Sequence, residues 1–241
     1  MKLIRTENYT EMSLTAGKII VDKIRSNPSL TLGLATGSTP QGIYDFLIQD
    51  HVENKTSYKN VRSVNLDEYI GLPIKDENSY HYFMNQNLFK HLDIKENHTH
   101  IPNGAASDLE QECLRYEQLI KELGGVDLQL LGIGQNGHIG FNEPGTAFSS
   151  RTHIVTLAQS TREANSRFFN SLEEVPTHAI TMGIASILDS KEILLLVSGE
   201  RKAEALKRFV NGEISEDFPA SALKNHENVT VIADRDALKY I

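Results

Sequence analysis

The sequence predicts a single α/β domain with three layers, in which helices cover both faces of a doubly wound, mainly parallel, Rossmann-like sheet. Two observations favour this fold class. Strand-like apolar runs alternate with amphipathic, helix-like segments along the chain, which is typical of right-handed βαβ units. The strand-like runs are continuously apolar, which indicates strands buried on both faces. The chain has no low-complexity stretch, repeat or linker, so we expect one domain over residues 1–241.

The first half of the chain carries five predicted elements. They are a helix at Thr10–Ser26, a strand at Leu30–Ala35, a helix at Pro40–Gln49, a strand at Val61–Leu66 and a helix at Ser79–His91. The strands are short apolar runs, whereas the helices are longer and amphipathic. A proline suits the first turn of a helix, where its missing N–H costs nothing.

The second half continues the alternation. The clearest strand is Glu192–Ser198, which contains five consecutive apolar residues. The other predicted elements are strands at Val126–Gly132 and Val229–Ala233, helices at Ser107–Leu123, Ser160–Phe169 and Glu200–Val210, and a short helix after the last strand. Residues 142–180 are less regular, and we expect a mobile flap in this region.

Charge and composition exclude several classes of protein. The formal net charge is −8, whereas a nucleic-acid-binding protein normally carries a basic patch, so we expect no nucleic-acid partner. No window has the ~20 apolar residues of a membrane span, and residues 1–7 lack the apolar core of a secretory signal. The single cysteine, Cys113, has no neighbour that would activate it. His91, His98 and His100 lack a zinc-ligand spacing, so we expect no metal. Together with the single cysteine and the absence of a membrane span or secretory signal, this leads us to expect a reduced, soluble, cytoplasmic protein.

A glycine-rich loop, Gly132–Gly145, is the most informative segment of the chain. It follows the predicted strand Val126–Gly132 and holds five glycines in fourteen residues, which lets the backbone approach a ligand closely. The same loop contains Asn136, His138 and Glu143. A histidine titrates near neutral pH, and a neighbouring carboxylate can make it a working acid or base. Because open α/β sheets bind ligands beyond the carboxyl ends of their strands, this loop is the first candidate for an active site.

A second loop, Thr36-Gly37-Ser38-Thr39, joins the strand Leu30–Ala35 to the helix that begins at Pro40. Its amides and hydroxyls lie at a helix N-terminus, which is a natural place for a phosphate group. The segment is neither a Walker A loop nor Gly-x-Gly-x-x-Gly, so it does not indicate a nucleotide. For this loop taken alone, ordinary capping of the helix by serine or threonine is a competing explanation.

Two further side chains follow strands of the predicted sheet. Asp67 follows the strand Val61–Leu66, and Lys202 follows the strand Glu192–Ser198. Arg167, in a predicted helix, is a second candidate cation for an anionic ligand. Because the carboxyl ends of parallel strands share one edge, the loops that carry these residues are expected to converge on a crevice.

Five motifs give the chain a strong resemblance to glucosamine-6-phosphate deaminase, in the family's order and spacing and over nearly the whole chain. They are Leu34–Pro40, Asn65–Leu72, Gly134–Pro144, Asn165–Phe169 and Ser198–Ala203. The resemblance implies conversion of D-glucosamine 6-phosphate and water to D-fructose 6-phosphate and ammonia, by ring opening, aldose–ketose isomerisation and loss of the amine. It implies neither a metal nor an organic cofactor.

The resemblance also assigns roles to individual residues. A family histidine that matches His138 opens the sugar ring, and a carboxylate that matches Glu143 orients it. An aspartate that matches Asp67 moves the proton between C2 and C1, and residues 142–180 resemble the family's active-site lid. Asn136 stands where many relatives carry an aspartate; an amide transfers no proton, but it can hold a water or orient the imidazole. The family's phosphate-binding residues match Thr36, Gly37, Ser38, Thr39, Arg167 and Lys202.

Regulation is a second point on which the chain departs from part of the family. The family's allosteric hexamers are longer at the C-terminus and carry a pair of basic residues where this chain has His153 and Val155. The chain therefore resembles the short, unregulated branch. We expect a monomer or a small homo-oligomer whose ligand is a small sugar phosphate.

Two other functions stay open at this point. A 6-phosphogluconolactonase resembles this family in its fold and in a Gly-x-Asp-Gly-His loop, but it lacks the signatures Asp67–Tyr69 and Phe141–Pro144. A non-catalytic sugar-phosphate sensor would use a similar fold as an effector domain. Such a regulator needs a DNA-binding module, and the chain has no basic helix-turn-helix segment.

Overall fold

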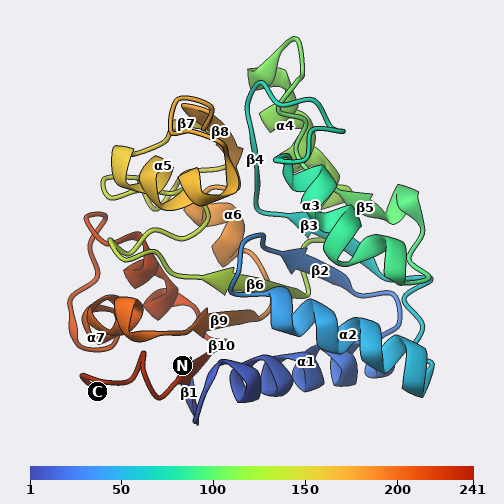
Figure 1. Ribbon diagram of the computed structural model, residues 1–241, viewed down its shortest axis with the longest axis horizontal. Coiled ribbons are helices and arrows are strands. Elements are labelled where there is room, and N and C mark those ends of the chain that lie inside the picture. Colours follow the sequence, from blue (N-terminus) through green and yellow to red (C-terminus); the bar gives the residue numbers. More distant parts are fainter.

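A computed structural model describes residues 1–241 and confirms the predicted class, an α/β fold around a mainly parallel sheet (Figure 1). The seven strands of the central sheet run in the order β1-β10-β9-β6-β2-β3-β5, and neighbouring strands pair in parallel. They are β1 (Lys2–Thr6), β2 (Thr31–Leu34), β3 (Arg62–Asn65), β5 (Thr99–His100), β6 (Leu128–Gly132), β9 (Ile193–Val197) and β10 (Val229–Asp234). A smaller antiparallel sheet contains β4 (Asp67–Tyr69), β8 (His178–Thr181) and β7 (His153–Thr156), in that order.

Helices connect these strands, and several of them have a polar N-cap residue. The side chains of Asn8, Ser79 and Asp108 each accept a hydrogen bond from the backbone N–H three residues later, which satisfies a free donor of the first turn. The α-helices are α1 (Tyr9–Ser26), α2 (Gln41–Asn54), α3 (Tyr80–Asn87), α4 (Leu109–Glu122), α5 (Gln159–Asn165), α6 (Ile184–Leu188) and α7 (Ala203–Asn211). Short 3₁₀ helices are η1 (Phe89–His91), η2 (Glu96–His98), η3 (Ser166–Phe168), η4 (Glu200–Lys202) and η5 (Pro219–Asn225).

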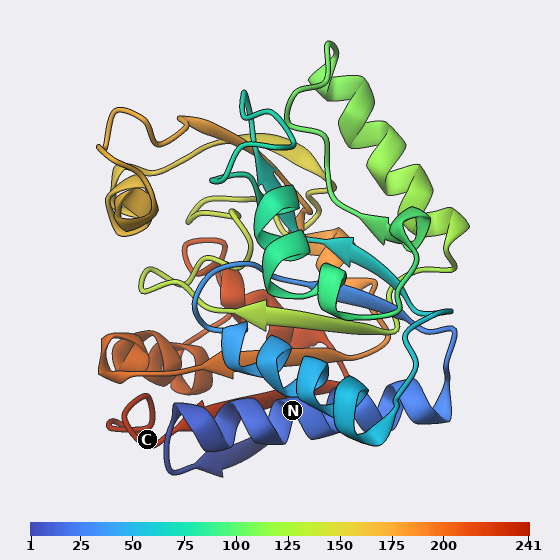
Figure 2. The same ribbon diagram turned by 45° about the vertical axis from the view of Figure 1, so that its right-hand side comes forward.

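The continuously apolar strands are buried on both faces of the central sheet, as predicted. Along β9, Leu194 and Leu196 join the cluster under α1, α2 and α3, whereas Leu195 and Val197 join the opposite cluster. Figure 2 shows α1 and α2 side by side against one face of the sheet. Because alternate residues of a strand point to opposite faces, each face of β9 contributes to a separate core.

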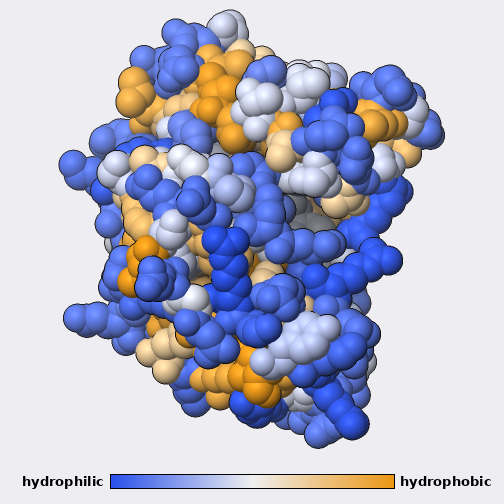
Figure 3. All heavy atoms as spheres, turned by 90° about the vertical axis from the view of Figure 1, so that its left-hand side faces the viewer, coloured by the Kyte–Doolittle hydropathy of each residue, from blue (hydrophilic) through white to orange (hydrophobic).

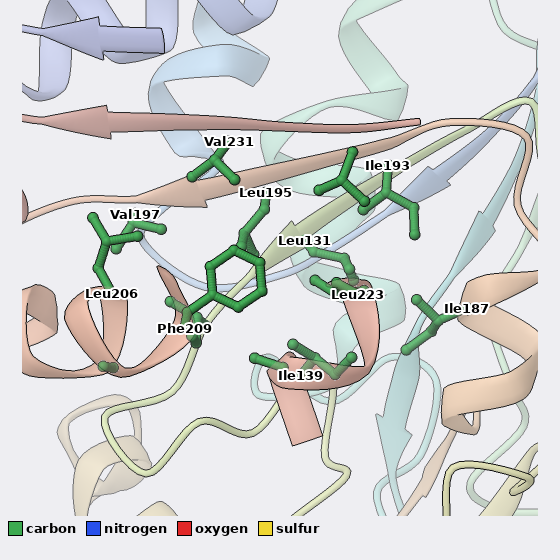
Figure 4. Close-up of a cluster of buried hydrophobic side chains, with 14 of the residues drawn as sticks. Leu131, Ile139, Ile187, Ile193, Leu195, Val197, Leu206, Phe209, Leu223 and Val231 are labelled. Atoms are coloured by element: carbon green, nitrogen blue, oxygen red, sulfur yellow. The ribbon is translucent and has the colours of Figure 1, made fainter. Parts of the chain in front are cut away.

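The second core lies on the other face of the sheet, under α4, α6, α7 and η5. Figure 4 shows Phe209 and Leu206 of α7 packed beneath Val197 and Leu195. Phe209 is 0% exposed, and burial of a large apolar side chain stabilises the fold by roughly 1.5–3 kcal/mol. This packing fixes α7, and with it the strand-to-helix segment after β9.

The strand order changes direction at β2. The chain runs from β2 to β3 on one side, whereas β6 pairs with the opposite side of β2 and leads on toward β9. The connections that leave the carboxyl ends of β2 and β6 therefore diverge. In open α/β sheets this reversal leaves a crevice where ligands bind.

Several elements differ from the sequence-based expectation. Strands β1 and β5 of the central sheet and the small antiparallel sheet were not predicted. Two strands of the small sheet, β7 and β8, lie within residues 142–180, which were expected to be less regular. The predicted short terminal helix is wrong. After β10 the Asp234 carboxylate accepts from Ala237 N, and residues 235–240 form consecutive turns held by isolated bonds such as Lys239 N to Asp236 O.

Two predicted helices are shorter than expected. The helix expected at Ser79–His91 ends at Asn87 and continues as η1, and the one expected at Ser160–Phe169 ends at Asn165 and continues as η3. The tighter 3₁₀ turn is common at helix ends. None of the helices is long and apolar enough to cross a membrane.

Candidate active site

A cavity of about 550 Å³ lies at the carboxyl edge of the central sheet. Its wall contains residues from the connections after β2, β3, β6 and β9, together with residues of α5 and η3. It therefore lies where the divergence of the β2 and β6 connections predicts a ligand site. Eight of the ten predicted site residues line it: Thr36, Gly37, Thr39, Asp67, Asn136, His138, Arg167 and Lys202.

The loop after β2 forms one end of the cavity. Gly37 has φ +91°, a conformation that L side chains rarely adopt. Helix α2 begins after Pro40, no serine or threonine side chain caps it, and Gly42 N donates to the Tyr9 hydroxyl at 2.8 Å. Helix capping by a serine or threonine therefore does not explain this loop. Since the first N–H groups of a helix attract anions, the end of α2 beside this loop is suited to a phosphate.

Two cations face the same end of the cavity. Arg167 of η3 donates a hydrogen bond from Nη2 to Ser38 Oγ at 3.3 Å, so Ser38 contacts the site through Arg167. Burial, and then the charge of Arg167, lower the pKa of Lys202. Neither cation takes part in any of the protein's ion pairs. Two adjacent, unpaired cations repel each other, and an anion between them would relieve that repulsion.

Asp67 lines the cavity from β4. It begins β4, whose antiparallel pairing with β8 joins Asp67 to Thr181, and it is 7% exposed. Burial, together with the charge of the adjacent Glu68, raises the pKa of Asp67 to about 8. A carboxylate whose pKa is raised into this range is a much stronger proton acceptor than an ordinary aspartate.

His138 lies over Gly134, and this close approach requires glycine. A Cβ on Gly134 would come within 2.3 Å of the imidazole ring. His138 Nδ1 lies 3.6 Å from Glu143 Oε2 and has no hydrogen-bond partner. The distance is within ion-pair reach but too long for a hydrogen bond. Catalytic hydrogen bonds are often long before a ligand binds, so the pair has the arrangement of a base with its orienting carboxylate.

Two neutral donors hold the Glu143 carboxylate. Asn136 Nδ2 donates to Glu143 Oε2 at 2.7 Å, and Thr161 Oγ1 donates to Glu143 Oε1. The backbone N–H of His138 in turn donates to Asn136 Oδ1 at 3.2 Å. Burial raises the pKa of Glu143, but its contacts with His138, Thr161 and Asn136 outweigh burial and hold the pKa below its ordinary value. Glu143 lies behind His138, which explains why it does not line the cavity.

The amide of Asn136 has a defined place in this arrangement. Its NH₂ group donates to Glu143 while its oxygen accepts from the backbone of the same loop. An ionised aspartate could make only the second of these bonds, because a carboxylate has no hydrogen to donate. Asn136 therefore orients the carboxylate that faces His138.

Aromatic side chains form a further wall of the cavity. The ring of Tyr69 lies 4.9 Å from Tyr80, 5.8 Å from Phe141 and 5.8 Å from Phe169, measured between centroids. Asn165 of α5 donates to the Tyr69 hydroxyl at 2.9 Å. These contacts attach α5 and the residues after it to the β4 side of the site.

Sequence reasoning missed the roles of Thr161, Asn165 and Tyr80. Thr161 contacts Glu143 across 18 positions, and Asn165 contacts Tyr69 across 96. No periodicity or spacing reports such contacts. The available signals were that Asn165 belongs to the same motif as Arg167, Asn165–Phe169, and that Tyr80 follows the capping residue Ser79.

Comparison with known proteins agrees with this geometry. The family model described as glucosamine-6-phosphate isomerases/6-phosphogluconolactonase matches residues 6–232. A glucosamine-6-phosphate deaminase of Halalkalibacterium halodurans is 57% identical over 241 residues, which cover 100% of this chain and 98% of that protein.

Solved structures agree as well. One described as a monomeric glucosamine-6-phosphate deaminase has a TM-score of 0.99 at 55% identity, with 100% of both chains covered. A 6-phosphogluconolactonase from Trypanosoma cruzi has a TM-score of 0.82 at 21% identity, over 100% of this chain and 96% of that one, and this likeness shows the fold alone. The resemblance predicted from the motifs is confirmed. The chain belongs to the glucosamine-6-phosphate isomerase/6-phosphogluconolactonase family and, within it, to the glucosamine-6-phosphate deaminases.

Proposed function

We propose that this protein converts D-glucosamine 6-phosphate and water to D-fructose 6-phosphate and ammonia. The observation that carries the proposal is a single cavity with unpaired cations at one end and both an acid–base histidine and a raised-pKa aspartate along its wall. Such a cavity suits a phosphorylated sugar that undergoes proton transfers at the opposite end of its carbon chain. Relatives that share more than half of the sequence carry the deaminase name.

The phosphate would lie at the end formed by the loop after β2. The loop residues Thr36, Gly37 and Thr39 and the cations Arg167 and Lys202 all line this part of the cavity, with Ser38 holding Arg167. Charge-assisted hydrogen bonds to phosphate are among the strongest in proteins. This end of the site anchors the substrate without taking part in bond breaking.

Ring opening is assigned to His138. Its imidazole would take the proton from the C1 hydroxyl and deliver a proton to the ring oxygen, which gives the open-chain aldehyde. Glu143, held by Asn136 and Thr161, would stabilise the imidazolium that forms between these two transfers. This is the base-plus-orienter arrangement of general acid–base catalysis.

Isomerisation is assigned to Asp67. Its carboxylate would remove the C2 proton of the open-chain sugar while one proton of the C2 ammonium passes to the C1 oxygen, which gives an enolamine. The carboxyl group of Asp67 would then return the proton to C1. The resulting imine at C2 would take up water and release ammonia, which leaves the ketose. The C2 ammonium of the bound substrate favours the ionised form of Asp67, because an opposite charge nearby lowers the pKa of a carboxyl group.

We further propose that residues 142–180 act as a lid on a single domain that spans the chain. Seven residues from this segment line the cavity, and they are Ser160, Thr161, Ala164, Asn165, Arg167, Phe168 and Phe169. Thr161 donates to the Glu143 carboxylate and Asn165 donates to the Tyr69 hydroxyl, so movement of α5 would release both contacts together. Closure of a lid excludes water while the reactive intermediates are present.

Finally, we propose a cytoplasmic, unregulated monomer. Arg151, two residues before His153 of β7, has its guanidinium paired with Asp189, which supports the lack of an effector-phosphate site. Figure 3 views the side that carries β7, α5 and α7, and hydrophobic residues there form separate patches among hydrophilic ones. Obligate interfaces are usually large and hydrophobic. A relative of 55% identity is described as monomeric.

Replacement of Asp67 by asparagine is expected to lower kcat by ~10²–10⁴-fold while KM changes little, because an amide keeps the shape but accepts no proton from C2. Fructose 6-phosphate and ammonia release would be measured with purified protein. Asp45→Asn, at an exposed position of α2, serves as the control and should retain full turnover. A near-normal kcat for Asp67→Asn would remove Asp67 from the mechanism.

Replacement of Lys202 by alanine is expected to raise KM for glucosamine 6-phosphate roughly 10- to 100-fold, with a smaller fall in kcat. The lost charge-assisted bond to phosphate accounts for about 1.5–3 kcal/mol. The adjacent, exposed Arg201 provides a matched control, since Arg201→Ala removes a cation outside the cavity. Equal KM values for the two variants would mean that the phosphate binds elsewhere.

Steady-state kinetics are expected to be hyperbolic, and N-acetylglucosamine 6-phosphate is expected to act at most as a weak competitor. Allostery needs a second site with different affinities for two global states, and the pairing of the Arg151 guanidinium with Asp189 opposes an effector-phosphate site beside His153. Initial rates with and without the acetylated sugar, together with sedimentation equilibrium, check this. A sigmoidal curve that the acetylated sugar makes hyperbolic, or a stable hexamer, would contradict the proposal.

A further inference from the structure

Glu68 is a buried carboxylate directly beside Asp67 in sequence. Successive residues of a strand point to opposite faces, so Glu68 of β4 lies on the far side of the strand from the cavity and does not line it. It is 1% exposed. A charge buried to this degree is costly unless it is fully hydrogen-bonded, so the partners of Glu68 decide whether it is held as a carboxylate.

Those partners saturate the carboxylate. Its Oε1 accepts from Tyr69 N at 2.8 Å and Tyr80 N at 3.0 Å, and its Oε2 accepts from His81 N at 3.1 Å. His81 Nδ1 lies 2.9 Å from Oε2 as a fourth partner. Two of the backbone donors are the first N–H groups of α3, where a helix favours negative charge. The three backbone partners are donors, and His81 is a fourth donor in the tautomer that carries a hydrogen on Nδ1. Such an arrangement stabilises an ionised carboxylate.

The same bonds fix the geometry of the reaction site. Tyr80, whose backbone N–H is held by Glu68, stacks on Phe141 with ring centroids 6.2 Å apart and lies tilted against Tyr69 with centroids 4.9 Å apart. The rings of Phe141 and Tyr69 line the cavity. The contact of Glu68 with α3 therefore ties the aromatic wall to β4, the strand that presents Asp67.

Other ionisable groups surround the two carboxyl groups. Those that face Asp67 are Tyr69 of β4, Tyr80 of α3 and Tyr116 of α4, with His138, Arg167 and Lys202 along the cavity wall. Those that face the Glu68–His81 pair are Glu112 and Arg115 of α4, which pair with each other at 2.5 Å. Burial raises the pKa of both Tyr80 and Tyr116, so these phenols stay neutral. Glu68 is therefore the carboxylate whose charge acts on Asp67.

We propose that Glu68 is a positioning residue for proton transfer: its saturated carboxylate holds α3 against β4 and keeps a negative charge behind Asp67, which strengthens Asp67 as a proton acceptor. The proposal rests on the proposed function, in which Asp67 carries the C2 proton. Glu68 touches neither the cavity nor the substrate and acts through Asp67. A stronger base removes a carbon-bound proton faster once it is ionised, and a fixed like charge is a direct way to make it stronger.

Removal of the charge tests the proposal. In the Glu68→Gln variant, Asp67 should ionise at a pH lower by about one unit, because the repulsion between adjacent carboxylates is lost. The midpoint is measured twice: by ¹³C NMR titration of the carboxyl carbons in the substrate-free protein, and from the acidic limb of kcat/KM for glucosamine 6-phosphate. Both midpoints should fall together, and kcat at high pH should fall as well.

Three further variants complete the design. Glu68→Asp keeps the charge and should restore the midpoint, even though its shorter side chain weakens the bonds to α3. His81→Lys, at a position where the side chain is 22% exposed, adds a cation beside Glu68 and should lower the midpoint even if Glu68→Gln does not fold. Glu117→Gln is the matched control. Glu117 also holds a backbone N–H and two hydroxyls, those of Thr152 and Ser186, but it belongs to the α4–β7 contact, so the midpoint should stay unchanged.

The outcomes separate this proposal from the proposed function. An Asp67 midpoint that stays unchanged in both Glu68→Gln and His81→Lys would overturn the role of Glu68, whatever happens to kcat, since a purely structural residue lowers activity without moving a titration. If the unmodified protein releases no ammonia from glucosamine 6-phosphate while the NMR midpoint shifts as expected, the proposed function fails and the coupling between Glu68 and Asp67 stands.

Discussion

The parallel pairing of β2 with both β3 and β6 is the constraint on which the site depends. Because β2 lies between strands reached in opposite directions along the sheet, the connections after β2 and β6 diverge and leave the cavity between them. The two cores hold that arrangement in place: α1, α2 and α3 pack on one face of the sheet, and α4, α6, α7 and η5 pack on the other. The polar side chains of these loops then form the binding site. The glycines in the loops leave room for side chains to lie close to the backbone, as His138 does over Gly134.

Electrostatics divide the cavity into two ends with different tasks. Arg167 and Lys202 form a cationic end without a carboxylate partner, whereas Asp67 is held in a desolvated place beside the charge of Glu68. The carboxylate of Glu143, behind His138, accepts hydrogen bonds from the neutral side chains of Asn136 and Thr161. Its negative charge is therefore available to His138. A sugar phosphate is complementary to this division, since its phosphate and its amine-bearing carbon lie at opposite ends of one small molecule.

The sequence was informative where burial on both faces forces a continuous apolar run, as in β9, and where strand ends carry polar residues. It predicted most of the central sheet, and eight of the ten residues predicted for the site line one cavity. It did not indicate β1, whose run Lys2–Thr6 lies at the sheet edge and is largely polar, or the short strands β7 and β8, whose partners are distant in sequence. Thr161 and Glu68 could not be predicted either, because their roles come from tertiary contacts, with Glu143 in one case and with α3 in the other.

The most direct test of this account is a crystal structure of the protein with the open-chain alditol that reduction of glucosamine 6-phosphate at C1 produces. The account predicts phosphate oxygens at roughly 3 Å from Lys202 and Arg167, with C2 and its amine beside Asp67 and the C1 end near His138. A phosphate bound at the Asp67 end of the cavity, or an alditol bound outside the cavity, would contradict the account.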